Sequence, residues 1–214
     1  MLKYVLATVS LLALSTPGAN AALIASFSQN PSNTPTVVAT DNGTVTNINV
    51  TDASTQITAG NGAILGTSLF SLNATSVDPA TTILTAVIQH YAGTFCFTSL
   101  NGCTGVNYLS GTFSDAAFGG LGGPGLNVNV NNPPDVLTLT SDVIAANQLA
   151  APNTFGLTFA NLTPLLHLNG TTIAAFTADY SGTVSSSASV PEPASLAVLG
   201  MGLIGLGMIR RKAN

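Results

Sequence analysis

Two histidines are the residues of this chain best suited to catalysis or metal binding, because imidazole can transfer protons and bind zinc near neutral pH. His90 and His167 stand far apart in the sequence, and neither belongs to a His-x-His or His-Glu-x-x-His motif. A zinc site would therefore have to be assembled from distant strands. We expect both histidines to be surface or hydrogen-bonded side chains, and we predict no metal ion, no cofactor and no catalytic residue.

The carboxylates of the central region do not form a recognisable hydrolytic pair. A glycosidase needs two carboxyl groups facing each other across the sugar, but residues 22–190 contain no glutamate and seven scattered aspartates: Asp41, Asp52, Asp78, Asp115, Asp135, Asp142 and Asp179. Asp41, Asp52 or Asp135 could join carbonyl oxygens around Ca²⁺, although no EF-hand loop is present. The chain also lacks a G-x-S-x-G motif, and its central region has no basic side chain to stabilise an oxyanion. We therefore predict that it is not an enzyme, with a secreted hydrolase as the second alternative.

One glycine-rich segment formally fits a dinucleotide-binding loop. Residues 120–125 match G-x-G-x-x-G, but such a site needs a strand before the glycines and a helix after them. Pro124 and an alternating segment from Leu126 onward follow instead. We interpret the segment as a loop without a cofactor.

The basic residues lie only at the two ends of the chain. Lys3 is the first, and the others are Arg210, Arg211 and Lys212. A central region without a basic side chain cannot neutralise phosphates, so nucleic-acid binding is excluded. Attraction to anionic lipid headgroups is excluded by the same absence.

The N-terminal residues have the pattern of an export signal. Lys3 precedes a mostly apolar segment, 4–14, and Thr16-Pro17-Gly18 would end a helix there. Ala19-Asn20-Ala21 is the small-x-small pattern that signal peptidase cleaves. We predict a signal peptide over 1–21, with cleavage before Ala22.

The C-terminal residues follow a different order. A Ser-rich linker is expected at 185–189, then Val190-Pro191-Glu192-Pro193, an uncharged span at 194–209, and the basic cluster 210–212. A helix over 194–209 would be about 24 Å long, against a hydrocarbon core near 30 Å, and flanking arginines can compensate for the difference. The basic cluster should stay cytoplasmic. We predict a transmembrane helix that holds the preceding domain outside the inner membrane.

This tail, 190–214, resembles the PEP-CTERM sorting signal of Gram-negative bacteria, also catalogued as the ice-binding protein C-terminal domain. The resemblance rests on Val190, Pro191, Glu192 and Pro193, the Gly/Leu-rich span, and Arg210, Arg211 and Lys212. It implies cleavage by an exosortase, a membrane transpeptidase, after transient anchoring in the inner membrane. It also implies a final location at the cell surface or outside the cell, and a link to exopolysaccharide or the biofilm matrix.

Cys96 and Cys103 are the only cysteines of the chain. Asn101-Gly102 between them favours a hairpin turn, since both residues tolerate positive φ. Export to an oxidising compartment makes a disulfide the expected state of this pair. The closed loop is short, so the stabilisation should be about 2.5 kcal/mol.

The central region alternates between apolar and polar residues, as half-buried strands do. The clearest segments are Leu126–Asn131, Thr154–Phe159, 174–184 and Ile83–Phe97. In the last of these, Ile83, Val87, Tyr91, Phe95 and Phe97 share one face and His90 lies on the other. We predict one all-β domain at 22–184, an antiparallel β-sandwich or a barrel-like variant of it.

Two further features of the central region carry structural predictions. A pattern of tyrosine, glycine and threonine recurs at Tyr91–Phe95, Tyr108–Phe113 and Tyr180–Val184, which indicates one kind of strand used three times and bent at its glycine. A single short helix is expected at 142–149, with Ser141 as its N-cap and Pro152 beyond its end.

The leading functional hypothesis is a structural or interaction protein of the cell surface or extracellular matrix. Asn127, Asn129 and Asn131 share one strand face, where they could bind polysaccharide hydroxyls without using charge. A dedicated carbohydrate- or ice-binding module is the alternative. The chain has no Trp to form a sugar platform, and Thr44 and Thr46 point away from Thr51, so these threonines make no flat array.

Overall fold

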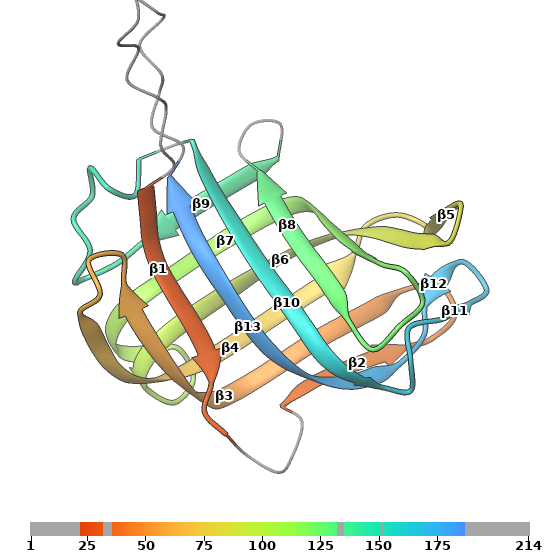
Figure 1. The fold of residues 1–214 in the computed structure, drawn as a ribbon, viewed down its shortest axis with the longest axis horizontal. Coiled ribbons are helices and arrows are strands. Elements are labelled where there is room, and N and C mark those ends of the chain that lie inside the picture. The colour runs from red at the N-terminus through yellow and green to blue at the C-terminus, as the bar shows by residue number, and fades with distance from the viewer. Residues whose placement is uncertain (1–21, 32–35, 132–134, 151, 187–214) are drawn as a thin grey trace, which may run out of the picture. The chain divides into compact units, whose positions relative to one another are not determined.

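The computed structural model describes residues 22–31, 36–131, 135–150 and 152–186, and every regular element in these ranges is a β-strand (Figure 1). The strands are β1 (Ala22–Gln29), β2 (Val37–Asp41), β3 (Thr46–Ala59), β4 (Ile64–Ser76), β5 (Thr81–Ile83), β6 (Ala86–Leu100), β7 (Thr104–Gly120), β8 (Leu126–Asn131), β9 (Val136–Thr140), β10 (Asn153–Thr163), β11 (Leu168–Asn169), β12 (Thr172–Ile173) and β13 (Phe176–Ser186).

The predicted terminal segments fall mostly outside these ranges. The signal peptide 1–21, the sorting segment 190–214 with its transmembrane helix 194–209, and linker residues 187–189 are not among the described residues. Within the described ranges, no helix is long and apolar enough to cross a membrane. The first two residues predicted as linker belong to β13 instead, because Ser185 and Ser186 pair with Leu23 and Ala22 of β1.

Eight antiparallel strands close into a barrel. Their order around the ring is β6, β4, β3, β1, β13, β10, β8 and β7, and β7 pairs with β6 to complete it. β5 pairs with β6, β9 pairs with β7, and β2 fills the position between β3 and β13 beyond the end of β1. Closure of the ring satisfies the hydrogen bonds that an open sheet leaves at its edges. The expected all-β domain is therefore a closed barrel rather than a two-sheet sandwich.

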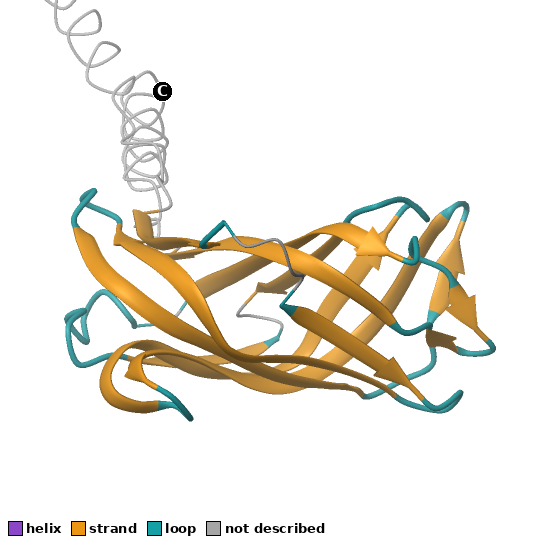
Figure 2. Cartoon of the chain, turned by 90° about the horizontal axis from the view of Figure 1, so that it is seen from below, coloured by secondary structure: helices purple, strands orange, loops and turns teal. Residues whose placement is uncertain are grey.

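Aromatic side chains fill the interior of the barrel. An eight-stranded ring is just wide enough for side chains to occupy its centre. Rings from opposite walls meet there, as between Phe95 of β6 and Phe155 of β10, whose centroids lie 4.4 Å apart. Phe70 of β4 contacts Tyr180 of β13 at 4.7 Å. A ligand of this barrel is therefore expected on its outer surface; Figure 2 shows the strands that form the barrel in a view turned by 90° from Figure 1.

The recurrent tyrosine–glycine–threonine pattern has a packing explanation. Each of its glycines pairs directly across the strands with a phenylalanine: Gly93 with Phe113, Gly111 with Phe95, and Gly182 with Phe27. The ring of each phenylalanine occupies the space in which a Cβ of the glycine would stand. The strand register shifts beside Gly93, as a bend there would require. At Gly111 and Gly182 the register does not shift, and the glycine instead leaves space for the phenylalanine ring.

Two sequence predictions about local structure are wrong. The 142–149 helix does not form, although the Ser141 hydroxyl accepts hydrogen bonds from the N–H groups of Val143 and Ile144 as a helix cap would. The strand predicted from Ile83 to Phe97 is interrupted by a turn in which Leu84 has a φ of 57°. Ile83 therefore lies in β5 and is exposed, whereas Val87, Tyr91, Phe95 and Phe97 are buried as predicted.

Candidate functional site

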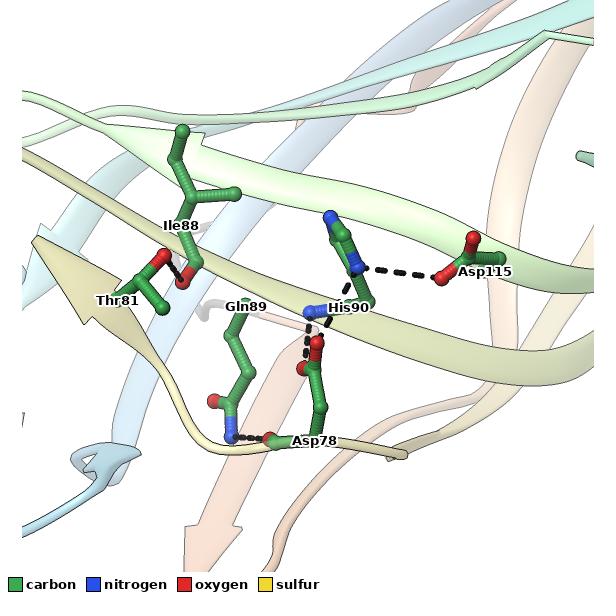
Figure 3. Close-up of polar contacts among 6 residues, drawn as sticks. All are labelled: Asp78, Thr81, Ile88, Gln89, His90 and Asp115. Atoms are coloured by element: carbon green, nitrogen blue, oxygen red, sulfur yellow. Dashed lines mark hydrogen bonds and ion pairs between the residues drawn. The ribbon is translucent and has the colours of Figure 1, made fainter. Parts of the chain in front are cut away.

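His90 lies between two carboxylates on the outer wall of the barrel (Figure 3). Its Nδ1 atom is 3.3 Å from Asp78 Oδ2 and 3.1 Å from Asp115 Oδ1. The other oxygen of Asp78 accepts a hydrogen bond from the backbone N–H of His90 at 2.9 Å. All three side chains are at least one-third exposed. His90 is thus a hydrogen-bonded surface histidine, as predicted.

The two partners of His90 were not evident from the sequence. Asp115 reaches His90 because the β6–β7 register shifts between Tyr91 and Gly93, and Asp115 itself has a φ of 61°. No residue pattern signals this displacement in advance. His167 has a different partner. Its ring atom Nδ1 is hydrogen-bonded to the carbonyl oxygen of Leu165 at 2.8 Å. Among the described residues, no group of three histidine, cysteine or acidic side chains could hold a metal ion.

The asparagines of β8 lie beside a groove on the outer wall, which we call the front groove. It has a volume of about 530 Å³ and is formed by β8, β10 and β13, with Phe27 of β1 contributing. Asn127 and Asn129 are exposed, and the residues that alternate with them, Leu126, Val128 and Val130, are buried, as predicted. Asn131 ends the strand opposite Thr154.

Two rows of uncharged, mostly polar residues cross the front groove and continue beyond its lining onto β1 and β3. Strand pairing aligns the first row as Asn127, Thr158, Ser181, Ser28 and Gln56, all of them exposed. The second row, over the same five strands, is Asn129, Gly156, Thr183, Ser26 and Thr58. Gly156 hollows the second row, because a Cβ at this position would point between Thr183 and Asn129 at ordinary contact distances of 3.7 and 3.9 Å.

A second groove, which we call the rear groove, lies over β3, β4, β6, β7 and β9 and has a volume of about 590 Å³. One row of its lining is Asn49, Asn73, Thr94, Thr112 and Thr138, aligned across the five strands. The adjacent row is Ser71, Cys96, Ser110 and Thr140. Sequence reasoning missed this face because its residues are alternate positions of five separate strands, and only the register brings them together.

The predicted disulfide closes one end of the rear groove. Cys96 and Cys103 are joined, with their Cα atoms 5.8 Å apart. The turn between them has positive φ at Gly102 and Cys103 rather than at Asn101. The Gly102 N–H donates a hydrogen bond of 2.8 Å to Asp52 Oδ1, which also accepts one from the Ser71 hydroxyl at 3.1 Å. Asp52 therefore holds the hairpin tip against β3 and β4.

Electrostatics distinguish both grooves from sites for anionic ligands. The front groove is lined by no charged residue, and Asp52 is the one ionisable residue lining the rear groove. Residues 22–186 carry seven aspartates and no lysine, arginine or glutamate. An anionic ligand would be repelled, and a neutral one would be bound through hydroxyl and amide groups.

Asp41, one of the aspartates considered for calcium, has a structural role at one end of the barrel. Its Oδ1 accepts hydrogen bonds from the Thr172 hydroxyl at 2.7 Å and the Gly43 N–H at 3.0 Å, and its Oδ2 accepts one from the Asn169 amide at 2.6 Å. Burial raises the pKa of this carboxyl, but these bonds and the Asn42 backbone outweigh it and hold the pKa below 3.8. Asp41 thereby fastens β2 to the β11–β12 hairpin.

We expect the contribution of Asp41 to the free energy of unfolding to decrease at acidic pH. Because the folded-state pKa is below the unfolded-state value, the contribution is complete above about pH 4 and is lost as the pH falls through the folded-state pKa. The melting temperatures of the wild type and Asp41→Asn should differ at neutral pH and converge in acid. Asp142→Asn is the control, and a difference for Asp41→Asn that persists unchanged in acid would contradict this assignment.

Comparison with known proteins identifies the C-terminal segment. Residues 189–212 match the family model of the PEP-CTERM protein-sorting motif, which confirms the sorting signal predicted at 190–214. No curated protein and no solved structure matches the chain. The motif is a substrate signal for exosortase, and it implies export followed by membrane-anchored processing toward the cell surface.

Proposed function

We propose that this chain is a structural or interaction protein of the cell surface or the extracellular matrix, and that its barrel binds uncharged polysaccharide. The sorting motif at 189–212 supports the location, because an exosortase substrate is exported and processed at the membrane. Signal peptidase would act before Ala22, and an exosortase would then act near Pro191-Glu192-Pro193 to give the surface or extracellular form. The proposed role is non-catalytic.

The observation that carries the binding proposal is the front groove with its two polar rows. Asn127 and Thr158 present an amide and a hydroxyl linked to each other at 3.1 Å, and Ser181 continues the row on the next strand. Neighbouring strands lie about 4.8 Å apart, so a row over five strands spans roughly 19 Å. Sugar hydroxyls can both donate to and accept from such groups. Each bond is worth about 1 kcal/mol, so affinity would come from many contacts along a polymer.

The test is binding of the purified full-length chain to hydroxyethylcellulose, dextran and galactomannan, which are neutral, and to polygalacturonate, which is anionic. Asn127→Ala/Asn129→Ala should weaken binding to the preferred neutral polymer about thirtyfold, as expected for the loss of two neutral hydrogen bonds of about 1 kcal/mol each. Binding should be insensitive to salt, because no charge pairing is involved.

The matched control is Asn147→Ala/Gln148→Ala, which removes two exposed amides from the loop between β9 and β10. This variant should bind like the wild type. Equal affinities for the wild type and the Asn127→Ala/Asn129→Ala variant would remove the front groove from the proposal. Preferential binding of polygalacturonate would overturn the choice of an uncharged ligand.

One feature favours ice as a second candidate ligand. Thr94, Thr112 and Thr138 stand in one row on neighbouring strands of the rear groove. Their surface is hollowed, however, and the hydroxyls of Thr112 and Thr138 bond each other at 2.5 Å. Thermal hysteresis of the purified chain, lost in Thr94→Ala, would support ice binding, and its absence would exclude it.

A further inference from the structure

We infer that the barrel has two polysaccharide-binding faces on opposite sides, so that one molecule joins two polysaccharide chains. This inference rests on the proposed function, and it adds the rear groove as a second site and cross-linking as the consequence. The two grooves are built alike and have similar volumes of about 530 and 590 Å³. Each carries two adjacent cross-strand rows made mostly of hydroxyl and amide side chains, with Gly156 in one row of the front groove and Cys96 in one row of the rear groove.

The order of the strands places the two grooves back to back. The front groove is centred on β10 and β13, and the rear groove is centred on β4 and β6. In one direction around the ring, two strands (β1 and β3) lie between β13 and β4. In the other direction, two strands (β8 and β7) lie between β10 and β6. Figure 1 shows β1, β13, β10 and β8 crossing in front of β3, β4, β6 and β7. The outward faces of these two layers therefore point in opposite directions.

The packed interior keeps the two sites separate. Rings such as Phe95, Phe155 and Phe70 occupy the space between the layers, so the grooves do not communicate through the barrel. A polymer segment lying in one groove would have to leave the surface and turn around the barrel to reach the other. Two sites facing away from each other therefore engage two different segments, which is the geometry of a cross-link.

The composition of both faces specifies the same class of ligand. Neither groove offers a cation to a uronic acid, sulfate or phosphate group. Asp52, at the end of the rear groove, accepts two hydrogen bonds from the fold through Oδ1, and its negative charge would repel an anionic polymer. Both faces thus fit a neutral polysaccharide, and the same polymer can occupy both.

The test compares binding with cross-linking in the full-length chain. The front-face variant is Asn127→Ala/Asn129→Ala, and the rear-face variant is Asn73→Ala/Thr94→Ala, which alters two exposed side chains. Binding to the preferred neutral polymer is measured by affinity electrophoresis, and cross-linking by the viscosity and light scattering of the mixture. Unchanged melting temperatures establish that each variant is folded.

We expect the wild type to raise viscosity several-fold, each single-face variant to bind more weakly than the wild type and without raising viscosity, and the combined variant neither to bind nor to raise viscosity. If the wild type binds but does not raise viscosity, or if either single-face variant loses all binding, the two-site inference fails and the proposed function stands. If single-face variants raise viscosity like the wild type, cross-linking has another origin and the inference also fails. If the wild type binds none of the neutral polymers, the proposed function itself is overturned.

Discussion

Gly182→Ala is expected to lower the free energy of unfolding by about 3 kcal/mol, the upper part of the range for overpacked cores. Gly182 lies on β13 directly opposite Phe27 of β1. An added Cβ would overlap both the Phe27 ring and the carbonyl oxygen of Gly156 on β10. The carbonyl belongs to a paired strand and cannot move without breaking the ladder, so the strain cannot be relieved by a side-chain rotation alone.

Urea unfolding of the purified chain measures this effect, and the melting temperature should fall by about 6–12 °C. Gly156→Ala is the matched control on the neighbouring strand, because its Cβ would stand in the front groove at 3.7 Å from Thr183 Oγ1. We expect its unfolding free energy to change by about 0.5 kcal/mol or less. Equal losses in the two variants would mean that the cost comes from replacing glycine in a strand and not from the Phe27 contact.

Loss of the Cys96–Cys103 disulfide is the second large effect, with an expected cost of about 2.5 kcal/mol from the freedom regained by the unfolded loop. The double variant Cys96→Ser/Cys103→Ser should unfold at lower urea than the wild type. The wild type in reductant should match it, which separates the lost bond from the effect of the serine side chains.

Asp52→Ala provides the comparison for the same hairpin. It removes the acceptor of the Gly102 N–H and of the Ser71 hydroxyl but leaves the disulfide in place. We expect it to cost about 1–2 kcal/mol, less than the double cysteine variant. If the reduced wild type were as stable as the oxidised form, the hairpin would be held by Asp52 and strand pairing alone.

The parts of the fold that were predictable are those decided by neighbouring residues. Leu126–Asn131 alternates without interruption, and β8 has these bounds, with Leu126, Val128 and Val130 buried and Asn127 and Asn129 exposed. The Cys96–Cys103 pair was predictable because these are the only two cysteines, close together in a chain with an export signal. The C-terminal sorting motif is a contiguous pattern, and the family match covers almost the same residues.

The parts that failed depend on backbone geometry that residue types do not report. Leu84 takes a positive φ without being glycine, asparagine or aspartate, so the turn between β5 and β6 has no sequence signature. Ser141 forms its cap-like hydrogen bonds, yet 142–149 folds into turns and bends between β9 and β10.

The rear groove was not predictable for a related reason. Asn73, Thr94 and Thr112 are unremarkable residues of three strands, and they become one row only through the register of β4, β6 and β7. Closure of the ring also requires the first and last strands to meet, and no local pattern encodes the pairing of Ala22 with Ser186.

The position of β13 determines how the barrel would respond to mechanical load. β13 is the strand nearest the sorting segment, and it is paired along one edge with β1 and β2 and along the other with β10. In a molecule tethered through its C-terminal end, tension enters the barrel at the end of this strand. The first strand to be loaded is therefore one that is hydrogen-bonded along both edges, and its release requires the loss of the bonds on both sides.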